Sequence, residues 1–192
     1  HRNAANTLLC RKEEYKMNAC DVSLQLFSYA FDGFLTSFFT PLISGAKVVL
    51  PDSQSIKDLA KLKEIIVNGG VTHFIGAPSF YRAIIENLSE EEAATLKVIT
   101  LAGDRLLPGL LELTKQKNPN IEIAHEYGVT EASVMSTIYR HQEKIDRISI
   151  GKPIWNTRLY IMNRHQSLQP VGAAGELCIS GEGLARGYVN NP

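Results

Sequence analysis

The chain has 192 residues, of which 44% are hydrophobic and 21% are charged, a balance typical of a globular protein with a sizeable core. Lys plus Arg and Asp plus Glu both number 20, so the formal net charge is zero and gives no electrostatic case for a nucleic-acid or anionic-membrane partner. The three cysteines are odd in number and show no CxxC spacing, which argues against a disulfide framework or a zinc site and favours a reducing cytoplasm.

The first two-thirds of the chain alternates segments of strand and helix character. The patterning predicts strands at Val22–Tyr29, Lys47–Leu50, Val71–Ile75, Lys97–Leu101 and Ile121–His125. It predicts helices at Gly33–Ile43, from the start signal Ser55-x-x-Asp58 to Gly69-Gly70, from Pro78 onward, and at Pro108–Lys117. This alternation predicts an α/β fold with a mainly parallel sheet flanked by helices.

The carboxyl ends of the predicted strands are the expected place for a ligand. In such sheets ligands bind in the crevice beyond these ends. We therefore expect the segments after Tyr29, Ile75, Leu101 and His125 to surround one crevice.

After Ser133 the helical periodicity fades. Short β-like runs appear at Arg158–Met162 and Glu176–Ser180, separated by Gly and Pro. We therefore divide the chain into an α/β substrate- and nucleotide-binding part, residues 1–133, and a β-rich continuation of the same core, residues 134–192.

One long uncharged run could be taken for a membrane-spanning segment. It extends from Gly33 to Ala46, which is shorter than the roughly 20 residues that a bilayer requires. It also contains Pro41 and Gly45, so a buried helix closed by Gly45 is the better interpretation.

Asp32 is an isolated carboxylate in this apolar part of the chain. A buried carboxylate must be paired, hydrogen-bonded or protonated. Its partner is either a Lys or Arg of the chain or the ammonium group of a ligand.

Residues 127–131, Tyr-Gly-Val-Thr-Glu, directly follow a predicted strand. An aromatic ring there can stack on a base, the Thr130 hydroxyl can bind a phosphate oxygen and Glu131 can hold Mg²⁺. The alternative is a polar turn whose glutamate is merely solvated. A second dense stretch, Gly175 to Tyr188, has glycines that permit tight turns, and by itself indicates a structural role.

Taken together, these stretches resemble the adenylation domains of non-ribosomal peptide synthetases, within the adenylate-forming ligase superfamily, and the resemblance covers essentially the whole chain. The matching stretches, in the order of the family, are Phe31-Asp32-Gly33, Leu101-Ala102-Gly103-Asp104, Glu126 to Glu131, Ile150-Gly151-Lys152-Pro153-Ile154 and Gly175 to Tyr188.

The resemblance implies an ATP-dependent, AMP-forming ligase of antibiotic and other secondary metabolism. The enzyme would join an amino acid to ATP, release pyrophosphate and pass the acyl group to the phosphopantetheine thiol of a carrier domain. Carrier and condensation domains of the same synthetase are the implied partners.

The resemblance also implies individual roles. Asp32 would bind the α-ammonium of the substrate. Thr130 would contact the α-phosphate and Glu131 would bind Mg²⁺, which makes these two the implied catalytic residues. The implied nucleotide-binding residues are Gly103, Asp104, Tyr127, Gly128 and Thr130, with Tyr127 against the adenine.

A side-chain pocket is implied by the specificity positions of the family. These positions fall on Asp32, Gly33, Thr36, Ile75, Thr100, Ala102, Glu126, Val134 and Met135. The set is similar to those associated with tyrosine, with Glu126 as acceptor for a distal donor. Glu126 could instead face solvent or pair with Arg105.

Two departures bear on activity. His125 replaces the usual Asn and Val129 the usual Pro of the family motif, and these departures favour the alternative of a non-catalytic, degenerate adenylate-forming scaffold. A second alternative is a near relative within the superfamily, an acyl- or aryl-CoA ligase. The family's phosphate loop is expected before His1, and its ribose-binding segment and catalytic lysine after Pro192. We therefore expect the chain to be a fragment without competent catalysis of its own.

Overall fold

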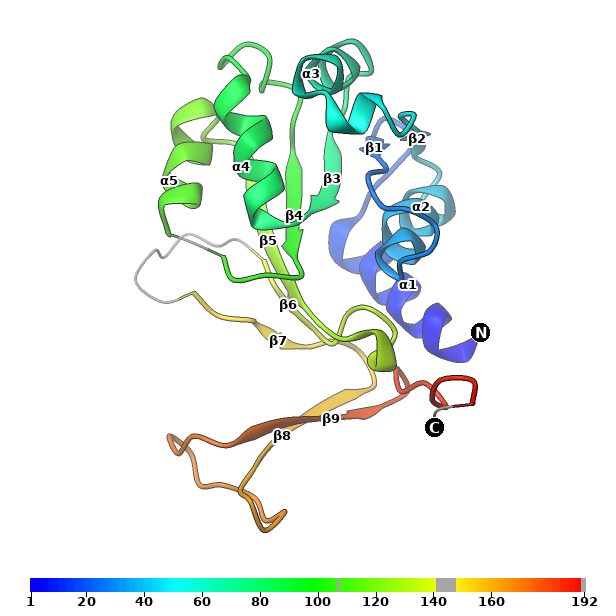
Figure 1. The fold of residues 1–192 in the computed structure, drawn as a ribbon, viewed down its shortest axis with the longest axis vertical. Coiled ribbons are helices and arrows are strands. Elements are labelled where there is room, and N and C mark those ends of the chain that lie inside the picture. Colours follow the sequence, from blue (N-terminus) through cyan, green and yellow to red (C-terminus); the bar gives the residue numbers. More distant parts are fainter. Residues whose placement is uncertain (107, 141–147, 191–192) are drawn as a thin grey trace.

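The computed structural model describes residues 1–106, 108–140 and 148–190, and a seven-stranded sheet forms its centre (Figure 1). In spatial order the strands are β2 (Lys47–Val49), β1 (Val22–Leu24), β3 (His73–Gly76), β4 (Val98–Ala102), β5 (Glu122–Tyr127), β6 (Thr137–Tyr139) and β7 (Lys152–Pro153). All neighbours from β2 to β5 pair in parallel, and β6 and β7 join in antiparallel pairing. The predicted α/β fold with a mainly parallel sheet is confirmed.

Helices cover both faces of this sheet. On one face, α3 (Leu59–Asn68), α4 (Pro78–Asn87) and α5 (Pro108–Lys117) enclose the large apolar core, to which β4 contributes Ile99 and Leu101. On the other face, Tyr15 of α1 (Arg2–Tyr15) packs against Val98 of β4, and α2 (Gly33–Ile43) lies beside α1. Alternate residues of a strand point to opposite faces, so β4 serves both layers.

The expected helix start at Ser55 is wrong. Residues Ser55–Lys57 form only a short 3₁₀ turn, η1, and α3 begins after Asp58. The Asp58 carboxylate accepts hydrogen bonds from the backbone N–H groups of Ala60 and Lys61, which satisfies donors that a helix start leaves free. Asp58 is suited to cap the helix because its own backbone is extended.

The strand predicted at Val22–Tyr29 ends earlier in the structure, since β1 stops at Leu24. The side chain of Gln25 accepts a hydrogen bond from the Phe27 N–H and donates one to the Phe27 carbonyl. This local bonding replaces the strand ladder and turns the chain toward α2.

The expectation that Gly33–Ile43 is a buried helix is correct for one face only. The buried residues of α2 are Gly33, Thr36, Ser37, Thr40 and Pro41. The larger Phe39, Leu42 and Ile43 remain 39–45% exposed. The buried face meets α1, where the Thr40 hydroxyl accepts a hydrogen bond from Arg11. No helix among the described residues is long and apolar enough to cross a bilayer.

The last two strands form a separate antiparallel ribbon. β8 (Thr157–Met162) pairs with β9 (Glu176–Gly181), and in Figure 1 the ribbon extends away from the main sheet. The division of the chain at residue 133 stays a prediction, and residues 141–147 and 191–192 of its second part lie outside the described residues.

Candidate functional site

A cavity of about 420 Å³ opens at the carboxyl ends of β3, β4 and β5, where the alternation of strands and helices predicted a crevice. Its volume lies in the range typical of small-molecule sites. Its lining residues are Phe27, Asp32, Gly33, Thr36, Ile75, Ala102, Gly103, Glu126, Gly128, Val129, Thr130, Glu131, Val134 and Tyr188.

Most of the residues predicted for the site lie on this lining, but four do not. Thr100 is buried and its hydroxyl donates to Tyr15 Oη at 3.0 Å, behind the cavity wall. Met135 is 1% exposed and packs in a small cluster with Cys10 and Ile154. Asp104 and Tyr127, predicted for the nucleotide, lie outside the lining, and Asp104 accepts the N–H of Arg105.

The side chains of Asp32 and Thr130, both on the cavity lining, are hydrogen-bonded to each other. The Thr130 hydroxyl donates to Asp32 Oδ2 at 2.6 Å. Among the described residues Asp32 forms no ion pair with a lysine or arginine, so its proposed internal cation is not found there. The bond joins the two side chains that were predicted to serve the amino acid and the phosphate, respectively.

Glu131 lies next to this pair in the 3₁₀ turn η2 (Thr130–Ala132). The Tyr188 hydroxyl donates to Glu131 Oε1 at 3.2 Å, and the nearby carboxylate charge raises the pKa of Tyr188. The described residues contain no cluster of three or more metal-ligating side chains. A single exposed carboxylate fits Mg²⁺ that is shared with the phosphates of a nucleotide, and the metal would neutralise phosphate charge there.

The backbone around η2 is tightly folded. A Cβ atom on Gly128 would lie 2.0 Å from the carbonyl oxygen of Val134, so only glycine fits at this close approach. Ser133 and Val134 adopt positive φ angles of 60° and 75°. A positive φ is uncommon for residues other than glycine, and especially for a β-branched residue such as Val134. Strain of this kind, next to a cavity, is typical of functional sites.

The Gly175–Tyr188 stretch contacts the same turn. Ser133 Oγ donates to the carbonyl of Gly183 at 2.7 Å, and the N–H of Ala185 donates to the carbonyl of Glu131 at 2.7 Å. The stretch therefore holds the turn in place, and Tyr188 at its end reaches the cavity.

Gly33 and Phe27 form one wall together. A Cβ atom on Gly33 would lie 2.9 Å from the Phe27 ring. The space that the missing side chain of Gly33 leaves is thus partly occupied by Phe27, a residue that the sequence patterns did not single out.

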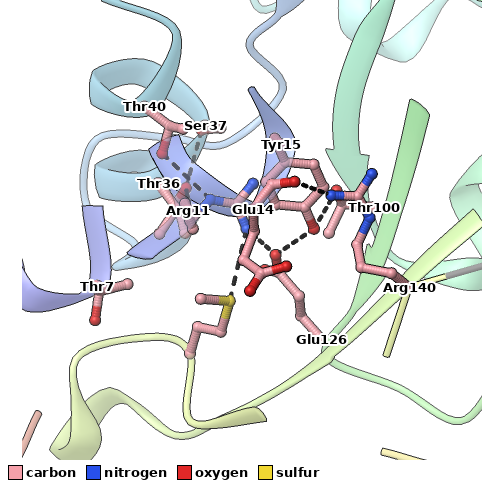
Figure 2. Close-up of polar contacts among 12 residues, drawn as sticks. Thr7, Arg11, Glu14, Tyr15, Thr36, Ser37, Thr40, Thr100, Glu126 and Arg140 are labelled. Atoms are coloured by element: carbon pink, nitrogen blue, oxygen red, sulfur yellow. Dashed lines mark hydrogen bonds and ion pairs between the residues drawn. The ribbon is translucent and has the colours of Figure 1, made fainter. Parts of the chain in front are cut away.

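Glu126 is the buried carboxylate of the cavity, and it is neither solvent-facing nor paired with Arg105. It is 4% exposed and forms an ion pair with Arg11 of α1, as Figure 2 shows. Both contacts to α1 use the same carboxylate oxygen, Oε1: one from Arg11 Nη1 and one from the Tyr15 hydroxyl at 2.5 Å. The sequence patterns missed Arg11 and Tyr15 altogether.

Two buried histidines have structural partners. His125, a departure from the family motif, is 5% exposed and donates through Nδ1 to the carbonyl of Ser149 at 2.9 Å. His73 lies 4.0 Å from Asp21, and its Nδ1 is 2.7 Å from the Thr72 hydroxyl. Burial lowers the pKa of His73 to about 4, against the opposing charge of Asp21, so this ring is neutral at pH 7.

The fold and the sequence are similar to known proteins over the whole chain. A family model described as AMP-binding enzyme matches residues 1–189. The chain is 51% identical over 188 residues to a plipastatin synthase of Bacillus subtilis (strain 168), covering 98% of the chain and 7% of that protein. It is 45% identical over 192 residues to gramicidin S synthase 2 of Aneurinibacillus migulanus, covering 100% of the chain and 4% of that protein.

Solved structures give the same picture. The non-ribosomal peptide synthetase FmoA3 in its alpha-methyl-L-serine-AMP bound form has a TM-score of 0.93 and 28% identity, covering 100% of the chain and 22% of that structure. Its AMPPNP bound form has a TM-score of 0.92 at 27% identity, covering 100% and 21%. The chain therefore spans only a small part of the proteins it matches.

Proposed function

The chain belongs to the AMP-binding enzyme family, and from that premise we propose that it forms the amino-acid-activating centre of a non-ribosomal peptide synthetase. The reaction joins an amino acid carboxylate to the α-phosphate of ATP, and pyrophosphate leaves. The observation that carries the proposal is the single cavity that brings together Asp32, Glu126, Thr130 and Glu131. The synthetases among its relatives support it, since they match along the entire chain.

Each of these side chains has a distinct task in this proposal. Asp32 binds the α-ammonium group, in place of the hydrogen bond that it now accepts from Thr130. The hydroxyl of Thr130, once free, donates to the α-phosphate. Glu131 would hold Mg²⁺, and the metal would supply neutralisation of phosphate charge. Gly103 on the cavity lining, with Asp104 and Tyr127 outside it, would form the nucleotide side, with Tyr127 against the adenine.

The side chain of the substrate occupies the part of the cavity near Glu126, and we propose tyrosine. Ile75, Ala102 and Val134 supply apolar walls, and Glu126 supplies an acceptor for the phenol. Thr100 and Met135 lie one layer behind and act through the residues in front of them. A site that hydrogen-bonds a hydroxyl can reject an analogue that lacks it by a large factor.

The alternative ligase and scaffold functions fit less well. An acid without an amine would give Asp32 no cationic partner, which disfavours an acyl- or aryl-CoA ligase. His125 keeps a buried hydrogen bond, and Val129 lies on the cavity lining, so neither departure removes a proposed ligand. Transfer of the acyl group to a phosphopantetheine carrier, and work beside condensation domains in the cytoplasm, belong to the same proposal.

Amino-acid-dependent exchange of pyrophosphate into ATP tests the proposal, with the intact synthetase that carries this sequence. We expect exchange with tyrosine above all other amino acids, and a large loss in Glu131→Gln. Glu86→Gln, an exposed carboxylate on α4, is the matched control and should leave exchange unchanged. Exchange only with amine-free acids would refute the amino-acid specificity, and no exchange at all would favour the scaffold.

A further inference from the structure

Helix α1 places a second layer of polar side chains behind the cavity. Figure 2 shows Arg11 and Tyr15 pointing from α1 toward Glu126 on β5. Neither Arg11 nor Tyr15 lines the main cavity. Both border a separate small cavity of about 20 Å³, which shares Thr36 and Ile75 with the main one. Both side chains form hydrogen bonds to Glu126, which does line the main cavity.

The carboxylate of Glu126 is held from one side only. Oε1 accepts from Arg11 Nη1 and from the Tyr15 hydroxyl at 2.5 Å. Among the described residues no hydrogen bond to Oε2 is found, and Glu126 borders the main cavity. The arrangement leaves one acceptor oxygen for a ligand.

Arg11 and Tyr15 are themselves fixed in place. Arg11 Nε donates to Thr40 Oγ1 at 3.2 Å, and its guanidinium carbon lies 4.6 Å from the centre of the Tyr15 ring. The Tyr15 hydroxyl accepts from Thr100 at 3.0 Å. Burial, reinforced by the charge of Glu126, raises the pKa of Tyr15 well above its ordinary value, so the hydroxyl keeps its proton and donates.

The charge of this group decides what Glu126 can recognise. An isolated buried carboxylate would favour a cationic side chain, because opposite charges attract strongly where water is excluded. Here the guanidinium of Arg11 already balances that charge, and both side chains are 4% exposed. The pair keeps an acceptor but has no net charge left to attract a cation.

We propose that Arg11 and Tyr15 are positioning residues for substrate selection: they neutralise and orient Glu126, so that the cavity selects an uncharged hydrogen-bond donor over a cationic side chain. The proposal rests on the amino-acid activation proposed above and concerns the same cavity. The alternative is that the ion pair only fastens α1 to the sheet. A fastening role would lower activity with all substrates alike, whereas a positioning role changes the ratios between them.

Pyrophosphate exchange by the intact synthetase with three probes of similar size separates these roles. The probes are tyrosine, phenylalanine and 4-(aminomethyl)phenylalanine, which carries an ammonium group one carbon beyond the position of the tyrosine hydroxyl. Arg11→Gln removes the balancing charge, and we expect kcat/KM for the cationic probe relative to tyrosine to rise by about tenfold or more. Tyr15→Phe removes one orienting donor, and we expect the preference for tyrosine over phenylalanine to fall by about tenfold.

Two further variants keep the test decisive. Arg11→Lys keeps the charge and should keep the rejection of the cationic probe, even if Arg11→Gln fails to fold. Arg82→Gln, an exposed arginine on α4, is the matched control and should change no ratio.

The outcomes are distinct. If the unmodified enzyme activates tyrosine but both ratios stay within about twofold in Arg11→Gln and Tyr15→Phe, the positioning role is refuted and the proposed function stands. If Arg11→Gln is inactive with every probe, Tyr15→Phe decides alone by its ratio. An unmodified enzyme that prefers the cationic probe to tyrosine also overturns the inference. Absence of exchange with any amino acid would refute the proposed function itself.

Discussion

Replacing Arg11 by Met should loosen α1, because the change leaves the carboxylate of Glu126 buried without its cation. Both side chains are only 4% exposed, so water compensates poorly for the lost partner. Removal of one member of a buried ion pair typically costs about 3–5 kcal/mol. Since 1.36 kcal/mol corresponds to a factor of ten, the opening equilibrium of α1 should rise by roughly two to four orders of magnitude.

Hydrogen–deuterium exchange of the backbone amides of residues 2–15, in the intact protein, measures this opening directly. Arg82→Met is the control, since its ion pair with Glu86 is exposed and such pairs contribute about 0–1 kcal/mol.

A double-mutant cycle separates the ion pair from simple loss of packing. Arg11→Met combined with Glu126→Leu removes both charges, and replacing a buried pair by apolar side chains is often close to neutral. Adding Tyr15→Phe removes the hydroxyl that would otherwise lose its acceptor. We expect the variant with all three substitutions to regain most of the amide protection that α1 loses in Arg11→Met alone. Costs that simply add, or unchanged exchange in Arg11→Met, would refute the coupling that we derive from the geometry.

Three further predictions concern other parts of the chain. Burial lowers the pKa of His73 from 6.5 to about 4, so between these pH values the unfolded chain binds a proton that the folded chain does not. Stability present above pH 6.5 is therefore lost on acidification, on the order of 3 kcal/mol in total. In His73→Gln the unfolding temperature should depend less on pH between 6.5 and 4. Gly128→Ala should abolish pyrophosphate exchange, because the added Cβ would lie 2.0 Å from the carbonyl oxygen of Val134. Gly109→Ala is the control and should keep exchange, because its Cβ would meet open space. Equal activities of the two variants would contradict this prediction. Asp58→Ala removes a helix cap and should cost about 1 kcal/mol, seen as faster amide exchange in residues 59–68; unchanged exchange there would mean that the cap is dispensable.

Much of the fold follows from local patterns in the sequence. Gly33–Ile43 and Pro108–Lys117 form helices with the predicted bounds, because glycine and proline mark their ends. The alternation of strands and helices was enough to place the candidate site at the carboxyl ends of parallel strands. Asp32 was singled out as an isolated charge in an apolar stretch, and Thr130 and Glu131 as polar residues after a predicted strand; their roles stay predictions.

Helix α1 escaped prediction for a physical reason. Its buried residues are Thr7, Cys10, Arg11 and Tyr15, which recur at helical spacing but are mostly polar. An apolar stripe is the signal by which a helix is recognised, and this helix replaces that stripe with hydrogen bonds. Glu126, which both Arg11 and Tyr15 contact, lies more than a hundred residues further along the chain, so no local pattern reveals this pairing.

By itself, the sequence determined the order of the elements, the family resemblance and the residues at the ends of the strands. Only the tertiary structure decided what those residues contact. Period-two alternation puts Glu122, Ala124 and Glu126 on one face of β5, but it does not say that Arg11 covers that face. The charge that a substrate meets at Glu126 depends on this partner, because electrostatic interactions act through space and not along the chain.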